Sequence, residues 1–155
     1  MRTLVVGIGS TIRGDDGVGV HAARQLKLRD ALPDVDIIEL GTAGLALLDF
    51  VEGYDRLIVL DAITSGASPG TVNVLTGDDV ARAAHLGVGH EADLPTTLAL
   101  GRRLARRQIP EEVVVVAVEA SNLHSFSERL TPAVEAAIEP ALAEVAQLCG
   151  DEAAR

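Results

Sequence analysis

The chain has 155 residues, a length that suits one folded domain with a substantial core. Its formal net charge is -10, so we expect neither nucleic acid nor an anionic membrane surface as a partner. Only 2% of its residues are aromatic, so a ligand site must work without stacking platforms. The single cysteine, Cys149, excludes a disulfide and a thiolate metal cluster, and no apolar run is long enough to span a membrane. With no apparent signal peptide, we expect a cytoplasmic monomer.

The first predicted strand is the apolar run 4–6, which ends in a glycine-rich turn. An apolar stripe then predicts a helix over residues 17–26. Between strand and helix the chain is polar, and its last two residues are Asp15 and Asp16. This acid pair therefore stands at the carboxyl end of a strand and at the start of a helix, where open α/β sheets bind ligands.

Three interpretations of the acid pair compete. Helix capping is worth roughly 1 kcal/mol, but one Asp suffices for it. A second Asp adds repulsion unless a cation compensates, which favours cation binding by at least one of the two. Dinucleotide binding is suggested by Gly7, Gly9 and Glu39, but Ile12 stands at the third glycine position and two carboxylates would repel a pyrophosphate.

The middle of the chain predicts three more strands. Residues 35–40 and 56–60 are apolar, and a short helix over 45–51 separates them. The strand 56–60 is apolar enough to lie in the centre of a parallel sheet, and we expect it to end at Asp61, which opens a loop. Residues 71–75 follow after a connection too short for a helical crossover, so they predict an antiparallel edge strand.

The rest of the chain predicts two long helices around one buried strand. The first helix covers 94–107, with Leu104 facing inward. The strand 113–118 is apolar throughout, so we expect it to be buried on both faces. The last helix covers 133–148 and should bend at Pro140.

This order of elements predicts an α/β fold, namely a single-domain three-layer sandwich over residues 1–149. Its sheet is expected to be twisted, five-stranded and mostly parallel, with one antiparallel strand and helices on both faces. Residues 150–155 are expected to form a frayed tail. Because right-handed crossovers bring the carboxyl ends of parallel strands to one edge, Asp16 and Asp61 should share a rim.

A histidine on that rim would complete a metal site. The chain has four candidates: His21, His85, His90 and His124. His85 and His90 flank a glycine-rich loop that can reach the rim, whereas His21 is expected to face solvent or to pack. Two carboxylates with one imidazole suit zinc, nickel, manganese or iron with positions open for a substrate. The alternative is that Asp61 only caps its loop and that His90 is a surface residue.

Six segments carry a family resemblance that covers nearly the whole chain in order. The most specific are VVGIGSTIRGDDGVGVH and LIVLDAI, and the others are GTAG, PGTV, GHEADLPTTLAL and LTPAVEAAIEPALAEV. Through them the sequence resembles the hydrogenase maturation endopeptidases, which process the large subunit of nickel–iron hydrogenases. The resemblance implies three metal-contacting, catalytic side chains, which fall on Asp16, Asp61 and His90. Relatives more often have Glu at the first of these positions.

The resemblance also implies a reaction and a partner. The reaction is one endoproteolytic cut that removes the C-terminal extension of the large-subunit precursor after nickel insertion. Nickel held by the precursor would be the recognition element, with zinc or another divalent ion as a substitute in isolation. Metal activation of the carbonyl or of water, and general-base catalysis by an Asp, both stay open. The alternatives are a non-catalytic chaperone that checks nickel occupancy and a small nucleotide-binding domain.

Overall fold

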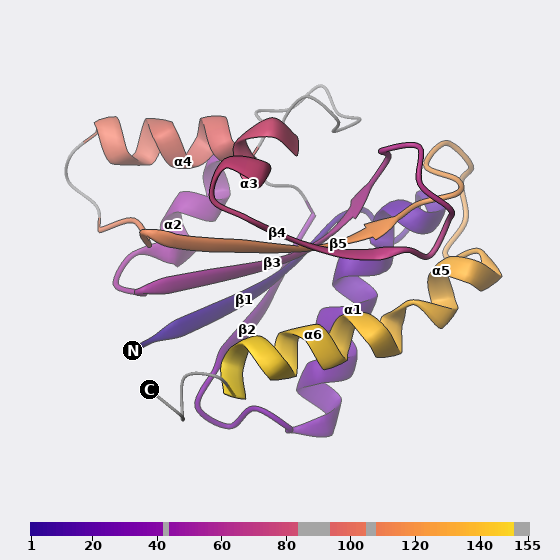
Figure 1. Cartoon of the computed structure of the whole chain (residues 1–155), viewed down its shortest axis with the longest axis horizontal. Coiled ribbons are helices and arrows are strands. Elements are labelled where there is room, and N and C mark those ends of the chain that lie inside the picture. The colour runs from indigo at the N-terminus through magenta and orange to yellow at the C-terminus, as the bar shows by residue number, and fades with distance from the viewer. Residues whose placement is uncertain (42–43, 84–93, 105–107, 151–155) are drawn as a thin grey trace.

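A five-stranded sheet runs through the centre of the computed structural model, which describes residues 1–41, 44–83, 94–104 and 108–150. The strand order is β2-β1-β3-β5-β4 (Figure 1). The strands are β1 (Thr3–Ile8), β2 (Asp36–Leu40), β3 (Arg56–Ile63), β4 (Val72–Thr76) and β5 (Glu112–Glu119). All neighbours are parallel except β4, which pairs antiparallel with β5 at one edge. The predicted sheet and its antiparallel edge strand are confirmed.

Helices cover both faces of this sheet, as expected. One face carries α1 (Val18–Arg29), α5 (Pro132–Ala136) and α6 (Ile138–Gly150). The other carries α2 (Leu48–Val51), α3 (Asp78–Ala83) and α4 (Leu94–Arg103) (Figure 1). Two short 3-10 helices, η1 (Gly14–Gly17) and η2 (Leu45–Leu47), precede α1 and α2. Within these described ranges, each helix is too short or too polar to cross a membrane.

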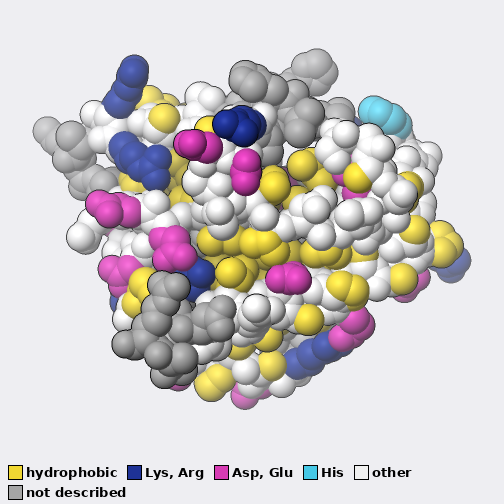
Figure 2. Space-filling view, viewed as in Figure 1, with side chains coloured by type: hydrophobic (Ala, Val, Ile, Leu, Met, Phe, Trp, Pro, Cys, Tyr) yellow, Lys and Arg dark blue, Asp and Glu magenta, His cyan; other side chains and the backbone are white. Residues whose placement is uncertain are grey.

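The central strand β3 contributes to two separate cores. Ile58 and Leu60 pack with side chains of α1, α5 and α6, whereas Leu57 and Val59 pack with side chains of α2 and α4. All four are buried, which explains why β3 is a continuous apolar run rather than an alternating one. Hydrophobic side chains also reach the surface in a band between the sheet edge and α6 (Figure 2).

Two predictions about the ends of elements were wrong. Leu104 is 61% exposed because its N–H donates to the carbonyl oxygen of Leu100, which places it one helical turn after Leu100, on the face of α4 that is exposed. Asp61 does not open a loop, because β3 continues to Ile63. The pairing with β5 extends equally far, so Asp61 lies opposite Ala117 inside the sheet.

The last helix is divided rather than merely bent. α5 ends at Ala136 and α6 begins at Ile138. Pro140 lacks an N–H group, and its ring would clash with the carbonyl oxygen four residues earlier, which belongs to Ala136. The break therefore falls where the proline forbids a continuous helix.

Glycines let α1 approach the sheet unusually closely. A Cβ atom on Gly19 would lie 2.1 Å from the carbonyl oxygen of Leu60, and one on Gly7 would lie 2.3 Å from the carbonyl oxygen of Gly19. Any side chain at either position would push the helix away. This contact holds the start of α1, and the acid pair before it, against the carboxyl end of β3.

Candidate functional site

Asp16 lies on η1, on a loop that folds back over the end of β1. Its Oδ2 atom accepts a hydrogen bond of 2.8 Å from the backbone N–H of Ser10. Gly9 makes this fold possible, because its φ is 136° and a Cβ there would lie 1.8 Å from the carbonyl oxygen of Asp16. The side chain of Asp16 is only half-buried, so it remains accessible at the rim.

Asp61 lies near the carboxyl end of β3, within electrostatic reach of Asp16. Its Oδ1 atom accepts a hydrogen bond of 2.8 Å from the N–H of Ala62. Burial and, to a smaller extent, the Asp16 carboxylate raise the pKa of Asp61 to about 7. The two acids, far apart in the sequence, therefore influence each other at one rim of the sheet.

This carboxylate pair has an uncompensated negative charge. None of the salt bridges among the described residues involves Asp16 or Asp61. A divalent cation between the two acids would favour the ionised form of both and relieve their mutual repulsion. Oxygen donors from two carboxylates suit a divalent cation, and an imidazole beside them would favour a transition metal.

Asp15, the other acid of the sequence pair, has a structural role. Its carboxylate is fully buried and accepts hydrogen bonds from the backbone N–H groups of Ser121, Asn122 and Thr131 and from the Thr131 hydroxyl, at 2.7–3.0 Å. Burial alone would raise the pKa of Asp15, but these bonds together lower it below its usual value. Asp15 thus ties the loop after β1 to the loop after β5. The N-cap positions of η1 and α1 are Arg13 and Gly17, and neither makes a side-chain capping bond.

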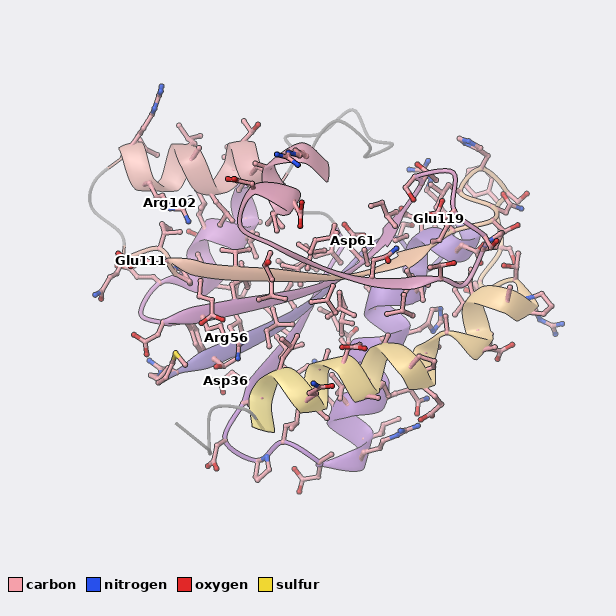
Figure 3. The ribbon with its side chains drawn as sticks, in the orientation of Figure 1. Asp36, Arg56, Asp61, Arg102, Glu111 and Glu119 are labelled. Carbon is pink, nitrogen blue, oxygen red and sulfur yellow. The ribbon has the colours of Figure 1, made fainter. Side chains whose placement is uncertain are left out.

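Glu119 is an acid at this rim that sequence reasoning missed. It ends β5, is 2% exposed, and accepts hydrogen bonds from the N–H and hydroxyl of Ser65 and from the N–H of Gly66. Figure 3 shows Glu119 and Asp61 toward the same end of the sheet, with Arg56 toward the other. In the sequence, Glu119 stands out as a charged residue directly after a wholly apolar run, and this signal could have identified it. Glu119 holds the loop that follows the strand carrying Asp61.

Replacing Glu119 with Gln is expected to lower the free energy of unfolding by about 1–3 kcal/mol, because an amide NH₂ would face one of the donors of Ser65 or Gly66 in place of a carboxylate oxygen. Urea denaturation of the purified variant measures this loss. Ser65→Ala is the matched control, since it removes only the hydroxyl bond of 2.6 Å and should cost about 1 kcal/mol. An unchanged urea midpoint in Glu119→Gln would show that the bonds to the loop contribute nothing.

The histidine candidates fall into two groups. His85 and His90 lie outside the described residues. His21 lies on α1 and lines a pocket of about 550 Å³ that neither Asp16 nor Asp61 lines. Burial lowers the pKa of its imidazole. His124 is exposed in the loop after β5. The described part of the chain thus contains two of the three residues predicted to bind metal, and within it no cluster of three metal-binding side chains forms.

Comparison with known proteins shows which proteins this chain is similar to in sequence and in structure. A family model described as hydrogenase maturation protease (HycI) matches residues 20–148. Hydrogenase 2 maturation protease of Escherichia coli (strain K12) is 36% identical over 148 residues, which cover 94% of this chain and 88% of that protein. Hydrogenase expression/formation protein HupD of Bradyrhizobium diazoefficiens is 34% identical, covering 91% and 74%. The structure of the hydrogenase maturating endopeptidase HybD from E. coli matches with a TM-score of 0.80 at 34% identity, covering 94% of this chain and 90% of that one.

Proposed function

Because this chain belongs to the hydrogenase maturation protease family, we propose that Asp16, Asp61 and His90 bind the nickel ion carried by its protein substrate. As a member of that family the chain is an endopeptidase, and it cleaves the C-terminal extension of a hydrogenase large subunit. The nucleotide-binding alternative is dropped, because the family and the acidic rim both argue against it. A purely chaperoning role has no observation in its favour.

The carboxylate pair carries this proposal. Asp16 and Asp61 come from different parts of the chain, yet the charge of Asp16 helps to raise the pKa of Asp61. With a pKa of about 7, the Asp61 side chain is half-protonated near neutral pH when no cation is bound. A second full negative charge beside Asp16 is therefore disfavoured. A nickel ion that arrives with the substrate would neutralise the pair. The empty protease would then hold the ion weakly until the substrate supplies the remaining ligands.

The chain's own residues position the reaction. Asp61 accepts the N–H of Ala62 and Asp16 accepts the N–H of Ser10, so each carboxylate has one oxygen held by the backbone. The contact between α1 and β3 sets the spacing of the two acids. Substrate-bound nickel would polarise the scissile carbonyl or activate a water molecule. With a pKa of about 7, Asp61 is also suited to exchange a proton near neutral pH.

Cleavage of a nickel-loaded large-subunit precursor tests the proposal. The wild type should shorten the precursor by one C-terminal fragment, followed by intact mass spectrometry, and precursor without nickel should stay whole. His90→Ala should slow cleavage at least about a hundredfold, since general acid–base or ligand residues typically contribute that much. His21→Ala, which removes the imidazole on α1, should cleave normally.

Two outcomes would contradict different parts of the proposal. An intact precursor with wild-type protein, under conditions where the E. coli relative cuts its own substrate, would remove the function. Normal cleavage by His90→Ala would leave the function but remove His90 from the site. We also propose a cytoplasmic monomer, which cell fractionation and light scattering test directly.

A further inference from the structure

Two large hydrophobic side chains are exposed on the loops that frame the candidate site. Phe126 is 89% exposed and Ile12 is 52% exposed. Single exposed apolar residues are common and need no explanation. Here, however, one lies on the loop after β1 that carries Asp16, and the other on the loop after β5.

Backbone hydrogen bonds bring the segments that carry these two residues together. Arg13 and Ser127 form a parallel bridge. The N–H of Ser127 donates to the carbonyl oxygen of Ile12 at 3.0 Å, and the N–H of Gly14 donates to the carbonyl oxygen of Ser127 at 2.8 Å. In this register Ile12 and Phe126 are the residues before each bridge partner. The bridge therefore brings the backbone of Ile12 close to the backbone of Phe126, and both side chains are exposed there.

The platform beneath the pair is held by many hydrogen bonds although it is a surface loop. The buried Asp15 carboxylate binds Asn122 and Thr131 on either side of Phe126. The Asn122 side chain in turn accepts the N–H of His124 and of Ser125. An aromatic side chain on a pre-ordered backbone loses little conformational freedom on binding, which is the usual property of an interface anchor.

The pair is also continuous with the surface that the protein substrate must cover. The N–H of Asp16 donates to the carbonyl oxygen of Arg13, the residue next to Ile12. Ile12 therefore lies one backbone turn from Asp16, next to the place where the proposed function puts the metal ion of the substrate. Arg13, Glu128 and Arg129 are exposed near the pair, so charged side chains of both signs surround these two apolar residues. A second copy of this chain on the same patch is an outcome that the experiment below distinguishes.

We propose that Ile12 and Phe126 form a docking surface for an apolar segment of the hydrogenase large-subunit precursor, close to the metal it carries. This inference rests on the proposed function. The pair contributes to binding of the precursor and takes no part in the chemical step. Its substitution therefore changes KM and leaves kcat as it is.

Steady-state cleavage of nickel-loaded precursor tests the docking surface. Phe126→Ala is expected to raise KM about tenfold, as truncation of an aromatic anchor does, and Ile12→Ala should raise it less. Phe126→Leu should recover most of the loss because an apolar side chain is restored. Leu28→Ala is the matched control: Leu28 is 79% exposed but lies near the far end of α1, so KM should not change. Urea midpoints should be equal in all variants, because these side chains are exposed.

The outcomes separate the two proposals. If the wild type cleaves and Phe126→Ala has the wild-type KM, the docking surface is wrong and the proposed function stands. If Phe126→Ala lowers kcat with KM unchanged, the pair does not dock substrate and the inference is also overturned. If the wild type forms a dimer in light scattering that Phe126→Ala abolishes, the patch joins two copies of this chain instead. Failure of the wild type to cleave removes the function on which the inference rests.

Discussion

Replacing Asp61 with Asn is expected to abolish cleavage of the precursor and to leave the folded chain at least as stable as the wild type at pH 8. The Asn carbonyl oxygen can still accept the N–H of Ala62, which Asp61 binds at 2.8 Å. What the substitution removes is the negative charge that the proposed metal ligand needs. Loss of activity without loss of stability would separate a functional carboxylate from a structural one.

The expected pH dependence follows from the direction of the pKa shift. The pKa of Asp61 is about 7 in the folded chain, against 3.8 for an Asp side chain in water. Between these values the folded state binds more protons than the unfolded state, so wild-type stability should fall as the pH rises from 4 to 7 and stay lowered above it. Asp61→Asn lacks this loss. Urea denaturation should show that the free energy of unfolding of Asp61→Asn, relative to that of the wild type, is higher at pH 8 than at pH 5.

Asp34→Asn is the matched control for the charge change. Asp34 is an exposed acid in the turn before β2, at the opposite end of the strands from Asp61. It should keep full cleavage and the wild-type pH profile of stability. Cleavage by Asp61→Asn at the wild-type rate would show that Asp61 is not part of the site. If Asp61→Asn loses as much stability from pH 5 to pH 8 as the wild type does, Asp61 is not the group that causes the pH dependence of stability.

The sheet was predictable because its signals are local. Apolar runs at 4–6, 56–60 and 113–118 can be buried on both faces only in a mostly parallel sheet with helices on each side. The shared rim of Asp16 and Asp61 then followed from the direction of the strands. Where β3 ends was not predictable, because its last residues are held by pairing with β5, which is distant in the sequence.

The division of roles at the rim was not predictable either. Asp15 and Asp16 are neighbours of the same residue type, and only the loop after β5 distinguishes them, by donating its N–H groups to Asp15. Glu119 is similar, because its partners Ser65 and Gly66 belong to a loop whose path is set by the rest of the fold. A local pattern identifies acids at the end of a strand, but long-range hydrogen bonds decide which of them face solvent.

Replacing Asp15 with Ala is therefore expected to cost about 3 kcal/mol or more of the free energy of unfolding. The substitution leaves the N–H groups of Ser121, Asn122 and Thr131 without their charged acceptor, and a hydrogen bond to a charged group contributes roughly 1.5–3 kcal/mol. Urea denaturation at pH 7 measures the loss. Because the folded state lowers the pKa of Asp15, its stabilising effect is present above about pH 4, the ordinary pKa of Asp, and disappears as the pH falls through the lowered value.

Asp16→Asn provides the contrast that makes this test decisive. Asp16 is half-buried and accepts one hydrogen bond, from the N–H of Ser10 at 2.8 Å, which the Asn carbonyl oxygen can retain. Its stability should stay within about 1 kcal/mol of the wild type while cleavage is lost. If Asp15→Ala is instead as stable as the wild type, the loop after β5 is held by other contacts. Asp15 would then have no structural role that distinguishes it from Asp16, and cation binding would have to account for both acids.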